Sequence, residues 1–224
     1  MREVVLDTET TGVSAKNGDR LVEIGCLELK NHVPTGEVFH CYINPERDVP
    51  AEAEAVHGLT TEFLADKPVF SEMASSFLEF VGSSPLVIHN SSFDLGFINS
   101  ELEVLGKCGI PNSQAIDTLS LARSRYPGAP VSLDALCRRF SIDNSRRTRH
   151  GALLDAELLA EVYLELRGGK QPGLDLTEQM VVNTDPKIES HSVTRPPRAH
   201  CPDDEELIAH SALIKKLENP IWDR

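Results

Sequence analysis

The order of the predicted strands and helices is the feature that most constrains the fold of this chain. Three strand-like stretches come first, at Glu3–Asp7, Leu21–Leu29 and Glu37–Ile43, and a short turn containing Asn, Pro and Gly joins the last two. Such a turn predicts an antiparallel hairpin. Short strands then alternate with helices, which indicates parallel pairing. We therefore expect an α/β fold with a mixed sheet of about five strands flanked by helices.

The remaining expected elements follow the hydrophobic periodicity. The later strands are Leu86–Ile88 and Ala115–Asp117, and the helices are Ala51–Ala65, Ser71–Val81, Ser92–Leu105, Thr118–Arg125, Ser132–Phe140 and Ala152–Arg167. Gly168 and Gly169 should end the last helix. We expect residues 1–167 to form one domain and residues 168–202, which are polar and lack periodicity, to form a flexible linker. Residues 203–224 form a tail with a short helix whose acidic first turn suits the helix dipole.

The composition favours a cytoplasmic protein. Hydrophobic residues make up 40% of the chain, but no apolar run reaches the roughly 20 residues of a membrane helix. The N-terminus has no signal-peptide pattern. Five cysteines without a C-x-x-C pair argue against a disulfide framework and a zinc site. We expect no membrane association.

The charge distribution constrains how the chain would bind a nucleic acid. Residues 1–167 contain 15 basic and 25 acidic residues, a net charge of −10. Residues 138–149 are the exception, with five arginines against Asp143, a net charge of +4. A polyanion is normally bound by lysines and arginines. We expect weak binding of a strand end by the chain alone and a partner that delivers that end.

Two carboxylates lie at the expected end of the first strand. Asp7 and Glu9 stand in D-T-E-T-T-G, and residues two apart in a strand point to the same face. Two anions held so close repel each other unless a cation neutralises them. The alternative is a polar strand end that leads into a loop.

Three more candidates lie in later segments. Asp94, in H-N-S-S-F-D, falls inside the apolar arc of its predicted helix, where a carboxylate needs a partner. The alternative is a helix-start acid that serves the dipole. His150 and Asp155 stand in H-G-A-L-L-D and would face one cavity only if His150 precedes the helix. An unrelated loop histidine and helix-start aspartate are the alternative there.

Together these residues predict a metal-dependent hydrolase. Four acids without a thiolate cluster suit Mg²⁺ or Mn²⁺ rather than zinc. Two such ions are a standard device for phosphodiester hydrolysis. A histidine with a pKa near 6.5 can accept a proton from water at neutral pH.

The three motifs, in this order and spacing, resemble those of the DEDDh exonucleases. The resemblance implies a ribonuclease-H-like fold, two Mg²⁺ or Mn²⁺ ions on four acids, and His150 as general base; the four acids are Asp7, Glu9, Asp94 and Asp155. Within that family, residues 142–164 and V-H-G-L at Val56–Leu59 resemble the epsilon proofreading subunits of bacterial DNA polymerase III. Family members release nucleoside 5′-monophosphates from 3′ ends.

The resemblance also implies substrate contacts. By motif position, Thr10 would contact the 3′ end, and Val56 and His57 would pack on the terminal base or sugar. Asn90 would support the site, and Glu52 would contact the 3′-hydroxyl. Without the resemblance, the residues alone would indicate that Thr10 is a threonine in a turn and that His57 is a histidine at a helix end whose hydrogen bonds are made within the protein.

The tail resembles two partner-binding segments. Gln171, Leu174 and Leu176 resemble the short motif by which bacterial proteins bind the sliding clamp; a plain linker is the alternative. Residues 203–224, with Trp222, resemble the epsilon tail that anchors to the polymerase III alpha subunit, and aromatic anchors are favoured in interfaces. A frayed amphipathic terminus is the alternative.

We therefore expect a proofreading 3′→5′ exonuclease that acts on mispaired or single-stranded DNA 3′ ends. An RNA 3′ exonuclease of the same superfamily is the first alternative. A non-catalytic assembly subunit is the second.

Overall fold

The computed structural model describes residues 1–145, 147, 149–169 and 202–216. The chain divides into two units, Met1–Asp175 and Leu176–Arg224. All the strands and all but one of the described helices lie in the first unit. The candidate clamp-binding residues Gln171, Leu174 and Leu176, as well as Trp222, lie outside the described residues.

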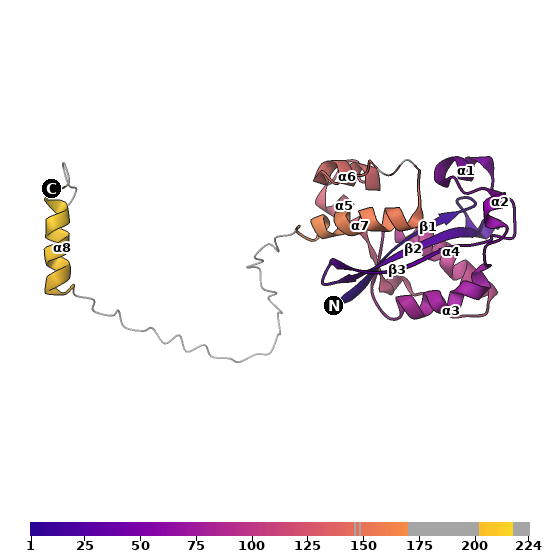
Figure 1. Cartoon of the computed structure of the whole chain (residues 1–224), viewed down its shortest axis with the longest axis horizontal. Helices are drawn as coiled ribbons and strands as arrows, with labels where there is room; N and C mark the ends of the chain where they lie inside the picture. Colours follow the sequence, from indigo (N-terminus) through magenta and orange to yellow (C-terminus); the bar gives the residue numbers. More distant parts are fainter. Residues whose placement is uncertain (146, 148, 170–201, 217–224) are drawn as a thin grey trace, which may run out of the picture. The chain divides into compact units, whose positions relative to one another are not determined.

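One mixed sheet of five strands organises the first unit, in the order β3-β2-β1-β4-β5. Figure 1 labels β1, β2 and β3 of this sheet. Its strands are β1 (Arg2–Thr10), β2 (Leu21–Lys30), β3 (Val33–Tyr42), β4 (Leu86–Ile88) and β5 (Ala115–Asp117). The first three pair antiparallel, and β4 pairs in parallel with both β1 and β5. The predicted fold class is therefore confirmed. Because β1 is central, its C-terminal end is surrounded by the later helices.

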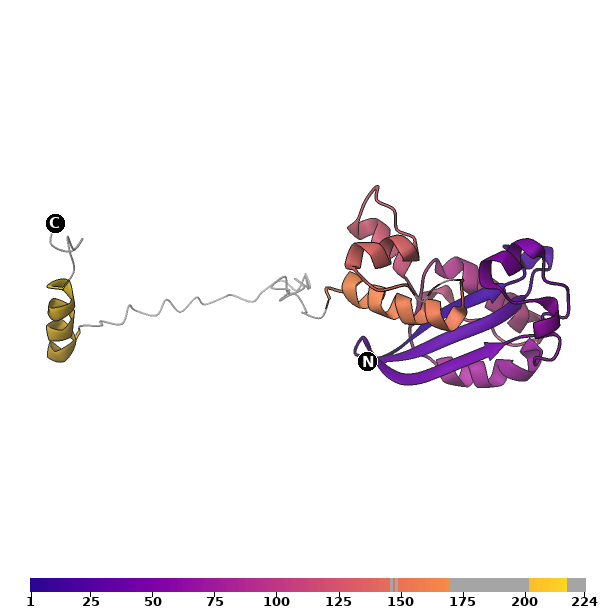
Figure 2. The same cartoon turned by 45° about the horizontal axis from the view of Figure 1, so that its top comes forward.

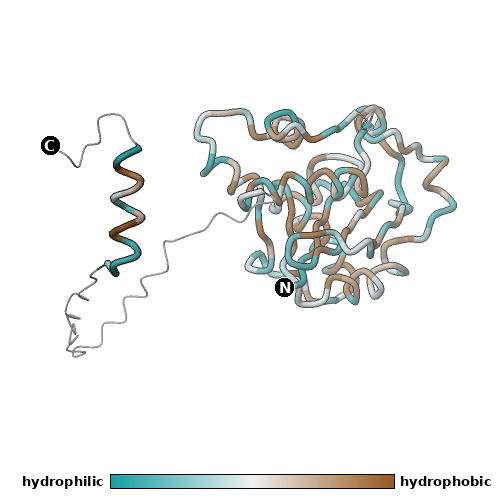
Figure 3. Tube along the Cα trace, turned by 60° about the vertical axis from the view of Figure 1, so that its left-hand side comes forward, coloured by the Kyte–Doolittle hydropathy of each residue, from teal (hydrophilic) through white to brown (hydrophobic). Residues whose placement is uncertain are grey.

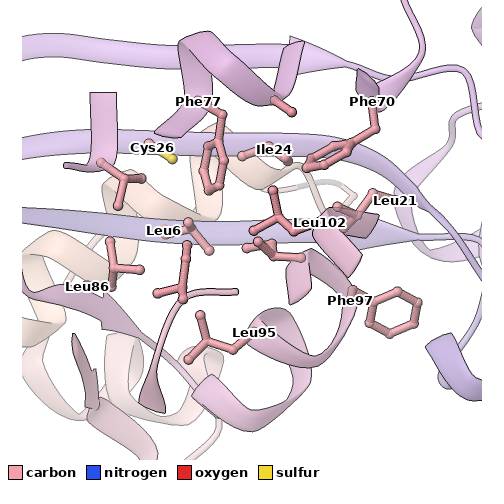
Figure 4. Close-up of a cluster of buried hydrophobic side chains, with 14 of the residues drawn as sticks. Leu6, Leu21, Ile24, Cys26, Phe70, Phe77, Leu86, Leu95, Phe97 and Leu102 are labelled. Carbon is pink, nitrogen blue, oxygen red and sulfur yellow. The ribbon is translucent and has the colours of Figure 1, made fainter. Parts of the chain in front are cut away.

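Helices cover both faces of this sheet (Figures 1 and 2). On one face, α3 (Phe70–Val81) and α4 (Ser91–Val104) pack their apolar residues against alternate residues of β1, β2 and β4, as Figure 4 shows. On the other face lie α5 (Thr118–Arg125), α6 (Leu133–Phe140) and α7 (Ala152–Leu166). Successive side chains of a strand point to opposite faces of the sheet, so each strand contributes residues to the hydrophobic core on either face. Val4 and Leu6 thus face α3 and α4, whereas Val5 faces α7.

Two strand boundaries differ from the predicted ones by three residues or more. Strand β1 continues to Thr10 rather than ending at Asp7, since residues 8–10 still pair with β2. Strand β3 begins at Val33 rather than Glu37, because Asn31 and His32 both adopt positive φ angles, 53° and 66°, and close a tight turn. Pro34 is tolerated inside β3 because β3 is an edge strand.

The predicted helix at residues 51–65 is two helices. These are α1 (Ala51–His57) and α2 (Thr61–Leu64). Gly58 separates them with a φ of 77°, and its N–H binds the carbonyl of Glu54, a left-handed helix cap that favours glycine. The break directs the end of α1 toward the C-terminal end of β1. Two short 3-10 turns, at Ala15–Asn17 and Asn112–Gln114, were not predicted.

Gly25 fixes the distance between β2 and the start of α7. A Cβ atom at this position would lie 2.3 Å from the backbone carbon of Ala152 and the backbone nitrogen of Leu153. We expect Gly25→Ala to lower the free energy of unfolding by about 1–3 kcal/mol, because backbone atoms must move to relieve the overlap. Denaturant titration measures this loss.

The matched control for this prediction is Gly96→Ala. Gly96 lies within α4, and a Cβ there would meet no atom within 4 Å. Alanine is favoured over glycine in a helix by up to about 1 kcal/mol, so this variant should be at least as stable as the unmodified chain. Equal stability of the Gly25→Ala chain and the unmodified chain would contradict the close approach.

The described part of the second unit is one helix, α8 (Asp204–Ile214). Asp203 caps its N-terminus in a capping box with Glu206. Figure 3 shows that both ends of α8 are hydrophilic and that apolar residues lie between them. Leu207, Ile208 and Leu213 are exposed. Across the whole described part of the chain, the helices are too short or too polar to span a bilayer.

Candidate metal centre

Four carboxylates from three distant segments line one cavity of about 550 Å³. Asp7 and Glu9 come from β1, Asp94 from the first turn of α4 and Asp155 from the first turn of α7. His150 lines the same cavity. All five residues that the motifs singled out therefore lie around one space.

Asp7 and Glu9 project from the face of β1 that α7 covers. Burial raises the pKa of Asp7 well above its usual range, and the charges of Asp94, Glu9 and Asp155 raise it further. Burial likewise raises the pKa of Glu9 to about 8. Each raised pKa shows that ionising these acids together is costly without an added positive charge.

Asp94 reaches the cavity from the opposite face of the sheet. Its helix starts directly after Asn90, whose φ of 73° turns the chain from β4 into α4. The hydroxyl of Thr8 donates a hydrogen bond of 2.7 Å to Oδ1 of Asp94. Burial raises the pKa of Asp94 to about 7, although the Thr8 hydrogen bond lowers it. Asp94 is only 3% exposed, so the helix places a carboxylate where the apolar arc would predict a hydrophobic side chain.

The same arc contains Glu101, which the structure places in a different environment. Its carboxylate accepts two hydrogen bonds from Arg20, at 2.6 and 2.8 Å. Glu101 is therefore neutralised by a side chain, and it does not line the cavity. Of the two acids on this face of α4, only Asp94 turns toward the other carboxylates.

His150 precedes α7, which begins at Ala152 after the Gly151 cap. This is the arrangement in which His150 and Asp155 can face one cavity. Nδ1 of His150 lies 3.2 Å from Oδ2 of Asp155, and its side chain is 47% exposed. The hydrogen bond with Asp155 raises the pKa of His150. A backbone hydrogen bond of 3.2 Å from His150 to the carbonyl of Val56 anchors this loop to the end of α1.

Arg147 provides the cavity with its nearest positive charge. Its guanidinium donates to both carboxylate oxygens of Asp155, and one of its nitrogens lies 2.7 Å from Oδ1 of Asp134. Another lies 2.7 Å from Nδ1 of His150. A guanidinium can only donate, so Nδ1 of His150 accepts from Arg147 in one neutral tautomer. In the other tautomer Nδ1–H donates to Asp155 and leaves Nε2 free to accept a proton. Burial raises the pKa of Asp155, but its bonds with His150 and Arg147 outweigh burial and lower it.

The donor set fits a hard divalent cation. One ligand atom each of Glu9, His150 and Asp155 lies within 4.8 Å of the other two. Carboxylate oxygens are preferred by Mg²⁺ and Mn²⁺, and a positive charge among these acids removes the repulsion that raises the pKa values of Asp7 and Glu9. The single guanidinium of Arg147 offsets only part of that charge.

A second cavity, of about 570 Å³, adjoins the first and shares Thr8, Glu9 and Phe93 with it. It brings together four of the five predicted substrate-contact residues, namely Thr10, Glu52, Val56 and His57. Val56 is 47% exposed, so it offers apolar surface to a ligand. The remaining residue, Asn90, lines neither cavity.

His57 has one ring nitrogen free to face a ligand. The N–H of Leu59 donates to Nδ1 of His57 at 3.0 Å, which leaves the proton of the neutral ring on Nε2. Burial lowers the pKa of His57, with a partial offset from the carbonyl of Thr10. Nε2 is buried and makes no hydrogen bond of good geometry within the described residues, so the nearby carbonyl of Thr10 satisfies it only in part. A buried N–H without a well-placed partner is unfavourable unless a ligand accepts from it.

Asn90 acts through its backbone. Its N–H donates a 3.0 Å hydrogen bond to Oδ1 of Asp117, at the end of β5. Asparagine tolerates the left-handed conformation better than most residues, so Asn90 sets the start of α4 and, through it, the position of Asp94.

Sequence reasoning missed two residues that contact the acids. Thr8 lies between the two acids of the first motif, and the alternation of a strand directs it to the other face. That alternation was a usable signal for a partner of Asp94. Arg147 was grouped only with the basic stretch, and no periodicity links it to Asp155. Arg146 of that stretch lies outside the described residues.

Comparisons with known proteins agree with this geometry. A family model described as an exonuclease (RNase_T) matches residues 4–163. A DNA polymerase III subunit epsilon from Rickettsia typhi is 47% identical over 222 residues, which cover 97% of each chain. The DNA polymerase III subunit epsilon of Escherichia coli K12 is 43% identical over 245 residues, which cover 99% of this chain and 97% of that one.

Among solved structures, Exonuclease X in complex with 5′-overhanging duplex DNA has a similar fold. The TM-score is 0.57 and the sequence identity 25%. The match covers 73% of this chain and 90% of that one. The similarity supports a ribonuclease-H-like architecture.

Proposed function

This chain belongs to the exonuclease family and, within it, to the epsilon subunits of DNA polymerase III, and we propose from that membership that it is the proofreading 3′→5′ exonuclease of a replicative DNA polymerase. It releases nucleoside 5′-monophosphates from mispaired 3′ ends. The observation that carries the proposal is the convergence of four carboxylates and His150 on one cavity.

The exonuclease acts with a divalent cation, and our proposal extends to two Mg²⁺ or Mn²⁺ ions. Asp7, Glu9, Asp94 and Asp155 would hold them. When bound, the ions supply Lewis acidity to the attacking and leaving oxygens of the scissile phosphate. The hydrogen bond from Thr8 fixes one oxygen of Asp94, and the α7 helix fixes Asp155, so both carboxylates are oriented before substrate arrives.

His150 accepts the proton of the attacking water. It stands on a loop at the mouth of the cavity and is half-exposed, so it can pass that proton to solvent. Asp155 orients the ring through Nδ1, as a carboxylate partner does for a catalytic histidine.

The second cavity holds the terminal nucleotide. Val56 would pack on its base or sugar, the N–H of His57 would donate to it, and Thr10 and Glu52 would contact the 3′ end. Asn90 supports the site through the start of α4. None of these contacts requires a particular base. Selectivity for mispaired ends then comes from the lower cost of unpairing them, a few kcal/mol.

The alternative of an RNA 3′ exonuclease is not favoured, because the relatives that match nearly the whole chain are DNA polymerase subunits. The test compares a DNA primer-template with a mismatched 3′ end, the matched primer-template and a short RNA oligomer. We expect fastest nucleotide release from the mismatched DNA. Faster release from RNA would refute the DNA assignment.

We further propose that residues 1–167 are the nuclease domain and that residues 168–202 link it to a polymerase-binding tail at residues 203–224. The tail would bind the alpha subunit, with Trp222 as an anchor, and Gln171, Leu174 and Leu176 would bind the sliding clamp. The exposed apolar residues of α8 support a partner for this segment. A cytoplasmic location stays a prediction.

Truncation after Gly169 tests the proposed division of the chain into a nuclease domain and a polymerase-binding tail. We expect the shortened chain to keep the nuclease activity of the full chain within about twofold, because the sheet and both cavities lie before that residue. Co-purification with the polymerase should be lost. Retained co-purification would show that the tail is not the binding segment.

A further inference from the structure

A third cavity adjoins the carboxylate cavity. It has a volume of about 580 Å³ and shares Asp134, Arg147 and His150 with the carboxylate cavity. It shares no lining residue with the cavity that contains Val56 and His57. The carboxylate cavity therefore shares lining residues with each of the other two cavities.

Two exposed arginines, Arg138 and Arg149, distinguish the third cavity. Across residues 1–145, 147 and 149–169, the side chains of Arg138 and Arg149 form no ion pair or hydrogen bond. The acid in this cavity, Asp134, is already paired with Arg147 at 2.7 Å. Both guanidinium groups are therefore free to bind an anion.

The two arginines reach this cavity from different segments of the chain. Arg138 lies in the last turn of α6. The guanidinium of Arg149 packs over Gly58, where a Cβ atom would lie 2.3 Å from Nη1. Gly58 has a positive φ of 77° and needs no side chain, so Arg149 can cross the end of α1 at this point.

We propose that Arg138 and Arg149 bind the phosphodiester backbone of the nucleotides on the 5′ side of the scissile bond. This rests on the proposed function: if the terminal nucleotide fills the cavity of Val56 and His57 and its phosphate lies at the acids, the rest of the strand must leave the acids through a different opening. The third cavity is that exit. Asn144 and Ser145 line it as well and offer further polar groups.

Charge supports this path for the strand. Residues 1–167 carry a net charge of −10, so most of the domain surface repels a polyanion. Phosphate contacts by arginine position a strand without reading its sequence, which a proofreading enzyme requires. The cations line a cavity that joins the one in which the phosphodiester would be hydrolysed.

The test uses the full chain with Arg138→Ala, Arg149→Ala and the double variant, assayed in Mg²⁺. One substrate is a single-stranded DNA octanucleotide, which has phosphates 5′ of the scissile bond. The other is the p-nitrophenyl ester of thymidine 5′-monophosphate, which has none. Arg139→Ala is the matched control, because Arg139 lies on the same helix but stacks on Tyr126, 4.5 Å from its ring centroid.

For the octanucleotide, we expect the double variant to raise KM about tenfold and to change kcat less than about twofold, since binding rather than chemistry is weakened. The plot of log kcat/KM against log salt concentration should become shallower by about 0.7 for each arginine removed, the single-strand value per phosphate contact. For the ester, KM should change less than about twofold. Restoring charge with Arg138→Lys and Arg149→Lys should recover most of the salt dependence.

Three outcomes would overturn the proposal. An octanucleotide KM and salt slope in the double variant equal to those of Arg139→Ala would show that the strand does not cross this cavity. An equal rise of KM for the ester would show that the arginines act on the terminal nucleotide. If the unmodified chain hydrolyses neither substrate, the proposed function itself fails; if it hydrolyses both and the variants match it, only the strand path fails.

Discussion

Asp7→Asn should lower kcat at least about 10³-fold, which corresponds to a barrier increase of about 4 kcal/mol, and should make the cation-free protein more stable. Asparagine keeps the shape of the side chain but removes an anion that burial and three neighbouring carboxylates disfavour. We expect the free energy of unfolding in chelator at pH 8 to rise, because the folded state raises the pKa of this carboxyl and asparagine carries no charge. Nucleotide release and denaturant titration measure the two effects.

The opposite signs of these two effects distinguish a functional acid from a structural one. An acid that stabilised the fold would lower both activity and stability when replaced. Asp66→Asn is the matched control, because Asp66 is exposed and pairs with Lys67 on the surface; neither quantity should change appreciably. If Asp7→Asn and the unmodified chain release nucleotide equally slowly, the chain is a non-catalytic assembly subunit, and the exonuclease assignment is wrong.

The stability of the cation-free protein should fall by several kcal/mol between pH 5 and pH 8. The folded state raises the pKa of Glu9 to about 8 and that of Asp94 to about 7, so it retains protons that the unfolded chain has released. Stability falls with pH wherever the folded state binds more protons, and each pKa unit is worth about 1.4 kcal/mol. Thermal unfolding in chelator across this range measures the slope.

Among the other titrating groups, Asp7, His150 and Asp155 leave this sign unchanged, and the lowered pKa values of His57 and His89 oppose it only below about pH 6.5. The raised pKa of His150 contributes stability at low pH that is lost as pH rises through its folded-state pKa. The lowered pKa of Asp155 stabilises the folded state, and this contribution is fully present above about pH 4. It therefore does not change with pH between pH 5 and pH 8.

Divalent cations should reduce the pH dependence. A cation at a concentration of 100 times its dissociation constant stabilises the folded state by about 2.7 kcal/mol. This stabilisation should be greatest at the pH values at which the acids are ionised. Glu9→Gln should remove part of the slope in chelator, and Asp66→Asn should leave it intact. A slope that is flat or rises with pH would contradict the shared environment of the four acids.

The sequence by itself determined the order of the elements and the identity of the acids. Alternation in the strand predicted that Asp7 and Glu9 share a face, and the structure has them there. The helical arc predicted an inward-facing Asp94, because periodicity is a local property that the chain expresses without its neighbours. The composition also located the basic stretch at residues 138–149.

Only the tertiary structure decided which of the buried acids belong together. Asp94 and Glu101 occupy the same arc of α4, yet Arg20 neutralises Glu101 while Asp94 joins the cavity. Likewise, the contact of Arg147 with Asp155 and the passage of Arg149 over Gly58 join segments that no sequence period connects. Charges interact through space rather than along the chain, so the partners of each acid are set by the packing of helices on the sheet.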